Sequence, residues 1–245
     1  MIPPLDIIAG NLEAKEETII FNILNRAQYR HNPAVYDPGK SGFAGFAGSL
    51  FDKRLMDQEM LDAGYGRFTS PEERPFNRNL ASAERDFEVI PTGIILADLN
   101  QVNLTAEIRA AYLSLVPRIC GQGEDKHFGS SAEHDVAAFR AISERIHYGV
   151  FYVAERKFLD HPEKYTPLIE SCNPKGLTAL LTRSEVEERI LRRVMEKVNL
   201  YQSGANPKTR KLVDPDVIAA FYREHIIPLT KKGEVQYLLS RKLHQ

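Results

Sequence analysis

Residues 131–158 read SAEHDVAAFRAISERIHYGVFYVAERKF, and apolar side chains recur along this stretch at the spacing of one helix face. The pattern predicts a helix of more than about six turns. A helix of that length is typical of the central element of a helical bundle. Its apolar face comprises Val136, Phe139, Ile146, Val150, Val153 and Phe158.

The sequence before this stretch also has helical rather than strand periodicity. A first helix carries apolar residues from Ile7 to Leu24 and should end before the breaker His31-Asn32-Pro33. Further helices are expected at Leu50–Ala63 and Leu104–Leu115. No pair of alternating β-branched runs is joined by a tight turn. We therefore predict an all-α fold.

The C-terminal third contains two more helical patterns, separated by a loop rich in Gly, Asn, Pro and Lys at 203–211. The first should begin at Ser184, where Glu187 three residues later would complete a capping box. The second should begin after Asp214, a favoured N-cap residue, and reach Arg241, with Pro228 kinking its axis. Breaks are expected at 165–167 and 173–176. Without a repeat or a linker, residues 1–245 should form a single-domain multi-helix bundle.

The composition excludes several classes of partner. Lys and Arg number 32 against 33 Asp and Glu, so no excess positive charge is available to bind nucleic acid. No run of eighteen apolar residues could cross a membrane, and the N-terminus does not resemble a targeting peptide. Cys120 and Cys172 match no metal or redox spacing, which suits a reducing compartment. We expect a cytoplasmic protein with free thiols.

Two patterns that could indicate a ligand site favour a structural role instead. Gly42, Gly45 and Gly48 recur at every third residue, but no strand precedes them and no Gly-Lys-Ser/Thr follows, so a packed loop is favoured over a phosphate-binding loop. The histidines, among them His127 and His147, lack partners at metal-ligand spacing. No metal site is predicted.

Three charged residues occupy helix faces that otherwise look buried. Lys157 continues the stripe through Val150 and Val153, while Glu187 and Glu234 lie on the apolar flanks of the later helices. Periodicity alone favours structural roles over functional ones for these three residues. Lys157 would extend to solvent, Glu187 would cap its helix and Glu234 would pair with a surface lysine.

The local sequence around these residues points to a particular family. The segments Arg145-Ile146-His147-Tyr148-Gly149 and Val153-Ala154-Glu155-Arg156-Lys157-Phe158 resemble the active-site helix of eukaryotic-type chorismate mutases. Residues 186–194 and 227–241 resemble the next two active-site segments of that family, in the same order. Fainter similarity covers nearly the whole chain.

The resemblance implies rearrangement of chorismate to prephenate, in phenylalanine and tyrosine biosynthesis, without a cofactor or a metal. It assigns Lys157 and a protonated Glu234 as donors to the breaking ether bond. It assigns Glu187 as the acceptor for the substrate hydroxyl, with Thr230 orienting the substrate and Arg145 as a further catalytic residue.

The arginines depart from the family pattern in three places. Ala9 replaces an arginine of the first helix, so that cation is lost. Arg145 precedes Lys157 by twelve residues rather than eleven, which on a regular helix rotates it by about 100°. A π-bulge around 150–152 could absorb the extra residue. Arg183, one turn before Glu187, is a candidate replacement cation that would bind substrate; the alternative is an exposed arginine beside a helix N-terminus.

The resemblance also implies a homodimer that binds tyrosine or tryptophan at an interface site. Arg67, Gly129 and Ser130 match that effector site, whereas Gly66 replaces an expected arginine and Glu133 an expected small hydroxyl residue. Glu133 would repel a ligand carboxylate. Weak or absent regulation by these amino acids is therefore predicted.

Two other functions remain open at this stage. One is a lyase-like enzyme that releases pyruvate from chorismate or isochorismate, since altered arginines would change the pose of the substrate. The other is a catalytically impaired homologue with a binding role, favoured by Ala9 and the displaced Arg145.

Overall fold

The computed structural model describes residues 1–96 and 98–242, and within them the all-α prediction is confirmed. The only β-type pairing in these two ranges is an isolated bridge between Arg30 and Gly121. Two π-helical turns, Gly149–Val153 and Tyr222–Ile226, interrupt longer helical runs. The α-helices of the described chain are α1 Leu5–Arg26, α2 Leu50–Gly64, α3 Thr105–Ile119, α4 Phe128–Tyr148, α5 Ala154–Asp160, α6 Pro162–Glu170, α7 Pro174–Leu181, α8 Ser184–Gln202, α9 Pro215–Phe221 and α10 Ile227–Ser240.

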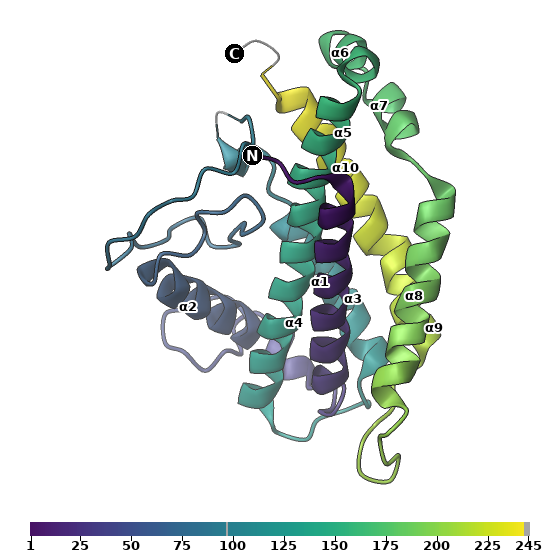
Figure 1. The fold of residues 1–245 in the computed structure, drawn as a ribbon. Coiled ribbons are helices and arrows are strands. Elements are labelled where there is room, and N and C mark those ends of the chain that lie inside the picture. Colours follow the sequence, from purple (N-terminus) through teal and green to yellow (C-terminus); the bar gives the residue numbers. More distant parts are fainter. Residues whose placement is uncertain (97, 243–245) are drawn as a thin grey trace.

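The continuous run of α4, the π-helical turn 149–153 and α5 forms the central element of the bundle (Figure 1). Helix α1 packs along α4, α10 packs against the π-helical turn, and α8 contacts α1 and α9. The predicted apolar face of residues 136–158 is buried, and its side chains join one hydrophobic core with those of α1, α3 and α10. The central helix predicted from residues 131–158 is therefore present, and it begins three residues earlier, at Phe128.

A buried ionic cluster fastens α1 to α4. The Nε of Arg26 donates to Asp135 at 2.6 Å, and the hydroxyls of Tyr36 and Tyr112 donate to the same carboxylate at 2.7 Å each. Arg26 and Asp135 are both fully buried. Since a buried charge is tolerated only when it is paired and hydrogen-bonded, this cluster fixes how α1 lies along α4.

Most of the predicted helices are found close to their expected bounds. The loop containing Gly42 and Gly45 is confirmed as a loop, with both glycines at positive φ. Helix α3 extends past the predicted Leu115 to Ile119, through Pro117. The expected break at 165–167 is wrong, because Pro167 lies inside α6. This short helix buries Tyr165 and Ile169, and we attribute its formation to that burial.

The predicted helix starts have opposite outcomes. Asp214 caps α9 as expected, by accepting from the backbone N–H of Asp216. The capping box at Ser184 is wrong: Arg183 holds the N-cap position of α8 without a side-chain cap, and Ser184 is already helical. Glu187 is therefore free of a capping role, and its carboxylate contacts another helix instead.

The predicted kink at Pro228 corresponds to a change of helix type. Pro228 lies in the first turn of α10, directly after the π-helical turn Tyr222–Ile226. Proline lacks a backbone N–H, so the regular i to i−4 hydrogen-bond pattern is interrupted at Pro228. The wider π-helical turn before it is compatible with that missing bond. Among the described helices, none has the length and apolar character needed to span a membrane.

Candidate active site

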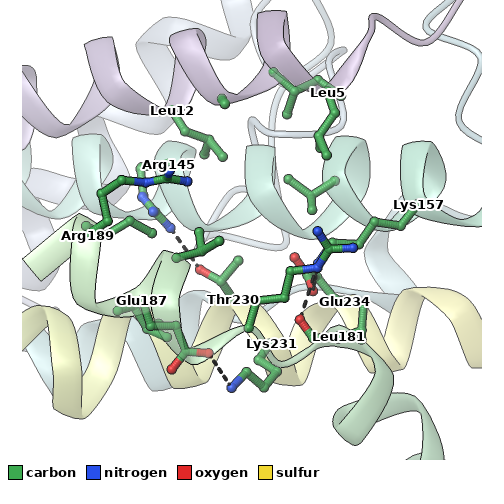
Figure 2. Close-up of a pocket in the computed structure, with 17 residues that line it drawn as sticks. Leu5, Leu12, Arg145, Lys157, Leu181, Glu187, Arg189, Thr230, Lys231 and Glu234 are labelled. Atoms are coloured by element: carbon green, nitrogen blue, oxygen red, sulfur yellow. Dashed lines mark hydrogen bonds and ion pairs between the residues drawn. The ribbon is translucent and has the colours of Figure 1, made fainter.

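A pocket of about 290 Å³ opens between α1, the central helix, α8 and α10 (Figure 2). This volume is at the lower end of the range for small-molecule sites. One wall is apolar, with Leu5, Ile8 and Leu12 of α1. The polar part of the lining consists of five basic side chains, two acidic side chains and one threonine: Arg145, Lys157, Arg183, Glu187, Arg189, Thr230, Lys231 and Glu234.

The π-helical turn Gly149–Val153 allows Arg145 and Lys157 to face the same pocket. On a regular α-helix the extra residue between them would rotate one away by about 100°. The wider turn absorbs that residue, so Arg145 lies inward at one end of α4 and Lys157 inward on α5. The predicted π-bulge is thus confirmed, and Ile146 does not take the place of Arg145 in the pocket.

Arg145 is buried, with 3% of its surface exposed, and is only partly satisfied by the protein. Its Nη1 donates to Thr230 Oγ1 at 3.2 Å, and its Nη2 lies 3.9 Å from Glu16. Its Nε has no hydrogen-bond partner within the described chain. A buried guanidinium with an unused donor is costly unless an acceptor arrives, so this end of the pocket is suited to an anionic ligand.

Lys157 and Glu234 form a pair at the other end of the pocket (Figure 2). Their charged atoms are 3.7 Å apart, and Lys157 also donates to the carbonyl of Leu181 at 3.4 Å. Glu234 is 6% exposed. Burial raises the pKa of its carboxyl group, and the opposing effects of Lys157, Arg145 and Lys231 do not cancel that rise. Glu234 is therefore suited to donate a proton.

Glu187 and Thr230 lie between these two ends. Glu187 accepts from Lys231 at 2.8 Å and remains half-buried, so its carboxylate has capacity for a further donor. The Thr230 hydroxyl donates to the Ile226 carbonyl at 2.7 Å, which leaves its oxygen to accept from Arg145. These contacts hold Arg145 in a fixed position.

Two exposed arginines complete the pocket, Arg183 at the N-cap of α8 and Arg189 within that helix. Arg183, named from the sequence, lines it next to Leu181. No sequence motif singled out Arg189, although it follows the pocket residue Val186 by three positions, a spacing that predicts the same helix flank. Ala9 also lines the pocket, from α1, so the lost arginine side chain would have entered this cavity.

No protein-family model matches the chain. The chain is 38% identical to the chorismate mutase of Schizosaccharomyces pombe over 248 residues, which cover 98% of this chain and 96% of that protein. It also superposes on the Aro7p chorismate mutase of Candida albicans in complex with L-Trp, with a TM-score of 0.90, 34% identity and coverage of 97% and 91% of the two chains. AtCM1 with tyrosine in its allosteric site gives a TM-score of 0.86 at 36% identity, with coverage of 96% and 95%.

The chain belongs to the chorismate mutase family.

The five residues assigned by resemblance to the chorismate mutase site lie in one cavity here. They come from four helices: Arg145 from α4, Lys157 from α5, Glu187 from α8, and Thr230 and Glu234 from α10. The histidines lie elsewhere. His147 is a buried residue of α4 whose Nε2 accepts from the backbone N–H of Leu104, and burial lowers its pKa to about 3. No cluster that could hold a metal ion occurs in the described parts of the chain.

The three effector residues of the chorismate mutase resemblance are not brought together within one chain. Arg67 donates to Glu144 at 2.7 Å and to Glu73 at 2.8 Å. Gly129 and Ser130 lie in the first turn of α4, and Glu144 follows Gly129 by fifteen positions, which is about 22 Å along the helix. A ligand within one chain cannot touch both parts.

The close approach of Gly149 to Thr230 yields a test of the site's packing. A Cβ at Gly149 would lie 2.8 Å from the Thr230 methyl group, so Gly149→Ala should destabilise the protein by about 1–3 kcal/mol through overpacking. Urea unfolding measures this. Gly10→Ala is the matched control, because a Cβ there meets nothing within 4 Å and alanine favours the helix. Equal stability of the two variants would contradict the packing described.

Proposed function

We propose that this pocket converts chorismate to prephenate. The observation that carries the proposal is the convergence of Arg145, Lys157, Glu187, Thr230 and Glu234 on one cavity, with more cationic than anionic side chains. Chorismate is a dianion whose reacting chair is a minor conformer. A cavity that holds both carboxylates lowers the barrier mainly by orienting the substrate beforehand.

The Lys157–Glu234 pair supplies the electrostatic part of this mechanism. As the ether bond breaks, negative charge grows on its oxygen, and donors already in position stabilise it without reorganising. Lys157 is one donor. Protonated Glu234 is the other, and its buried position keeps a proton on the carboxyl group to higher pH. Glu187 accepts from the substrate hydroxyl and Thr230 holds Arg145 toward the substrate.

The direct test is an assay of the purified protein with chorismate, with the product identified. Prephenate should form, and Lys157→Ala should lower kcat by about 10²–10³-fold, because one donor to the developing charge is lost. Lys164→Ala is the control, since Lys164 is exposed on α6 outside the pocket. Release of pyruvate would instead support a lyase. Folded protein that leaves chorismate unchanged would support a binding role.

The pH dependence of the reaction tests the role of Glu234. This carboxyl group is protonated below its raised pKa and ionised above it, so kcat/KM should fall as pH rises through that pKa. Glu234→Gln keeps a neutral donor at every pH, and its profile should lose this falling limb. The same limb in both proteins would assign it to another group.

The exposed guanidinium of Arg183 is proposed to bind substrate at the Lys157 end of the pocket, since it follows Leu181, whose carbonyl accepts from Lys157. Arg183→Ala should raise KM about tenfold, the effect of one charge-assisted hydrogen bond at an exposed position. Arg192→Ala, an exposed arginine of α8 outside the pocket, is the control. Steady-state kinetics that leave KM unchanged for Arg183→Ala would remove this role.

We propose a homodimer in which effector binding is weak. The separation between Arg67 and Gly129-Ser130 supports a site shared by two copies rather than one formed within a chain. Three features oppose strong binding there. Arg67 is already neutralised by Glu73 and Glu144. Gly66 has φ +89°, and a Cβ there would lie 2.9 Å from the Phe87 side chain, so a larger residue is strained at this position. Glu133 adds negative charge near Ser130.

Titration calorimetry with tyrosine and tryptophan tests this regulation. Any binding should be weaker than the micromolar range, because the arginine available to a ligand carboxylate is occupied. Micromolar affinity for either amino acid would contradict the proposal. Sedimentation of the same sample tests the dimer.

The remaining proposals are a single domain and a cytoplasmic location. The single domain is supported by one hydrophobic core that joins residues from Ile2 to Leu238. The location is supported by two unpaired thiols, one of them exposed, which suit a reducing compartment.

A further inference from the structure

Within the described chain, four of the five cations in the pocket lack a close ionised carboxylate. Lys231 is paired with Glu187 at 2.8 Å, whereas Lys157 lies 3.7 Å from Glu234, whose raised pKa favours the neutral carboxyl group. In the described chain neither Arg183 nor Arg189 has an ion pair or a side-chain hydrogen bond, and the nearest carboxylate to Arg145, that of Glu16, lies 3.9 Å away. The pocket therefore holds more positive charge than its own carboxylates neutralise.

Glu16 cannot neutralise Arg145, because another arginine occupies it. Both oxygens of Glu16 accept from Arg193, at 2.8 and 2.9 Å, and Lys197 lies 3.8 Å away. Arg145 reaches the same carboxylate only at 3.9 Å. Its charge and its unused Nε donor are left for a ligand.

Arg189 lies at the Arg145 end of the pocket. Both residues line the pocket, and Figure 2 draws both side chains on the side of Thr230 opposite Lys157 and Glu234. They reach this place from different helices, α4 and α8. Two like charges repel each other when the pocket is empty, and a carboxylate between them changes that repulsion into two attractions.

We propose that Arg189 and Arg145 together bind one carboxylate of the substrate, as a clamp with a fixed and a movable half. This inference rests on the proposed function, because it takes the substrate to be a dicarboxylate. Arg145 is the fixed half, held by Thr230. Arg189 is exposed at the rim and becomes ordered when the ligand binds. The second carboxylate then lies toward Lys157 and Arg183.

The test compares Arg189→Ala, Arg189→Lys and the control Arg192→Ala, which removes an exposed arginine of the same helix outside the pocket. A guanidinium at the rim of the pocket binds the substrate and the transition state equally well. Arg189→Ala should therefore raise KM about tenfold with a smaller change in kcat. Arg189→Lys should recover part of the loss, because charge remains but bidentate geometry does not. A KM for Arg189→Ala equal to that of Arg192→Ala would overturn the clamp.

A rescue variant separates lost charge from general damage. Ala9 is exposed and lines the pocket from α1, so Ala9→Arg places a guanidinium in the same cavity from another helix. Adding Ala9→Arg to Arg189→Ala should return KM toward the original value. A folded double variant that stays as impaired as Arg189→Ala would count against a role for charge.

Calorimetric binding of prephenate, itself a dicarboxylate, distinguishes failure of this inference from failure of the proposed function. Prephenate binding that Arg189→Ala weakens about tenfold, in a protein that does not turn over chorismate, would support the clamp and overturn the catalytic proposal. If the protein converts chorismate and Arg189→Ala leaves the affinity for prephenate unchanged, the clamp is overturned and the catalytic proposal stands.

Discussion

The π-helical turn Gly149–Val153 is the constraint on which the site depends. It adds one residue to the central helix without rotating Arg145 away from Lys157, so both cations face one cavity. It also lies where α10 approaches most closely. A Cβ at Gly149 would overlap the Thr230 side chain, and one at Gly233 would overlap the Val150 side chain. The absence of side chains at these glycines lets α10 present Thr230 and Glu234 to the pocket.

The net charge of the pocket depends on which nearby carboxylates are already paired with cations. Glu16 binds Arg193, Glu187 binds Lys231, and buried Glu234 has a raised pKa that favours its neutral form. Arg145 therefore keeps an unused donor in a buried position, and the exposed Arg183 and Arg189 line the same cavity without ion-pair partners in the described chain. A dianion is the ligand class that such a pocket stabilises most.

Several elements were predictable because their signals are local. Apolar spacing over 131–158 predicted the central helix, and Asp214 before a proline predicted the start of α9. Other predictions failed where tertiary contacts decided. Glu187 looked like a capping residue until the structure showed its carboxylate on Lys231 of α10. Pro167 looked like a break, but it lies within α6, where Tyr165 and Ile169 are buried.

The sequence by itself determined the helical class, the family resemblance and the candidates Lys157, Glu187, Thr230 and Glu234, because periodicity and local motifs are properties of neighbouring residues. Only the tertiary structure decided that Arg145 faces the pocket, that Arg189 lines the same pocket and that Arg67 is already bound by Glu73 and Glu144. These outcomes depend on helix rotation and on contacts between residues distant in the chain. Neither is encoded in spacing along one helix.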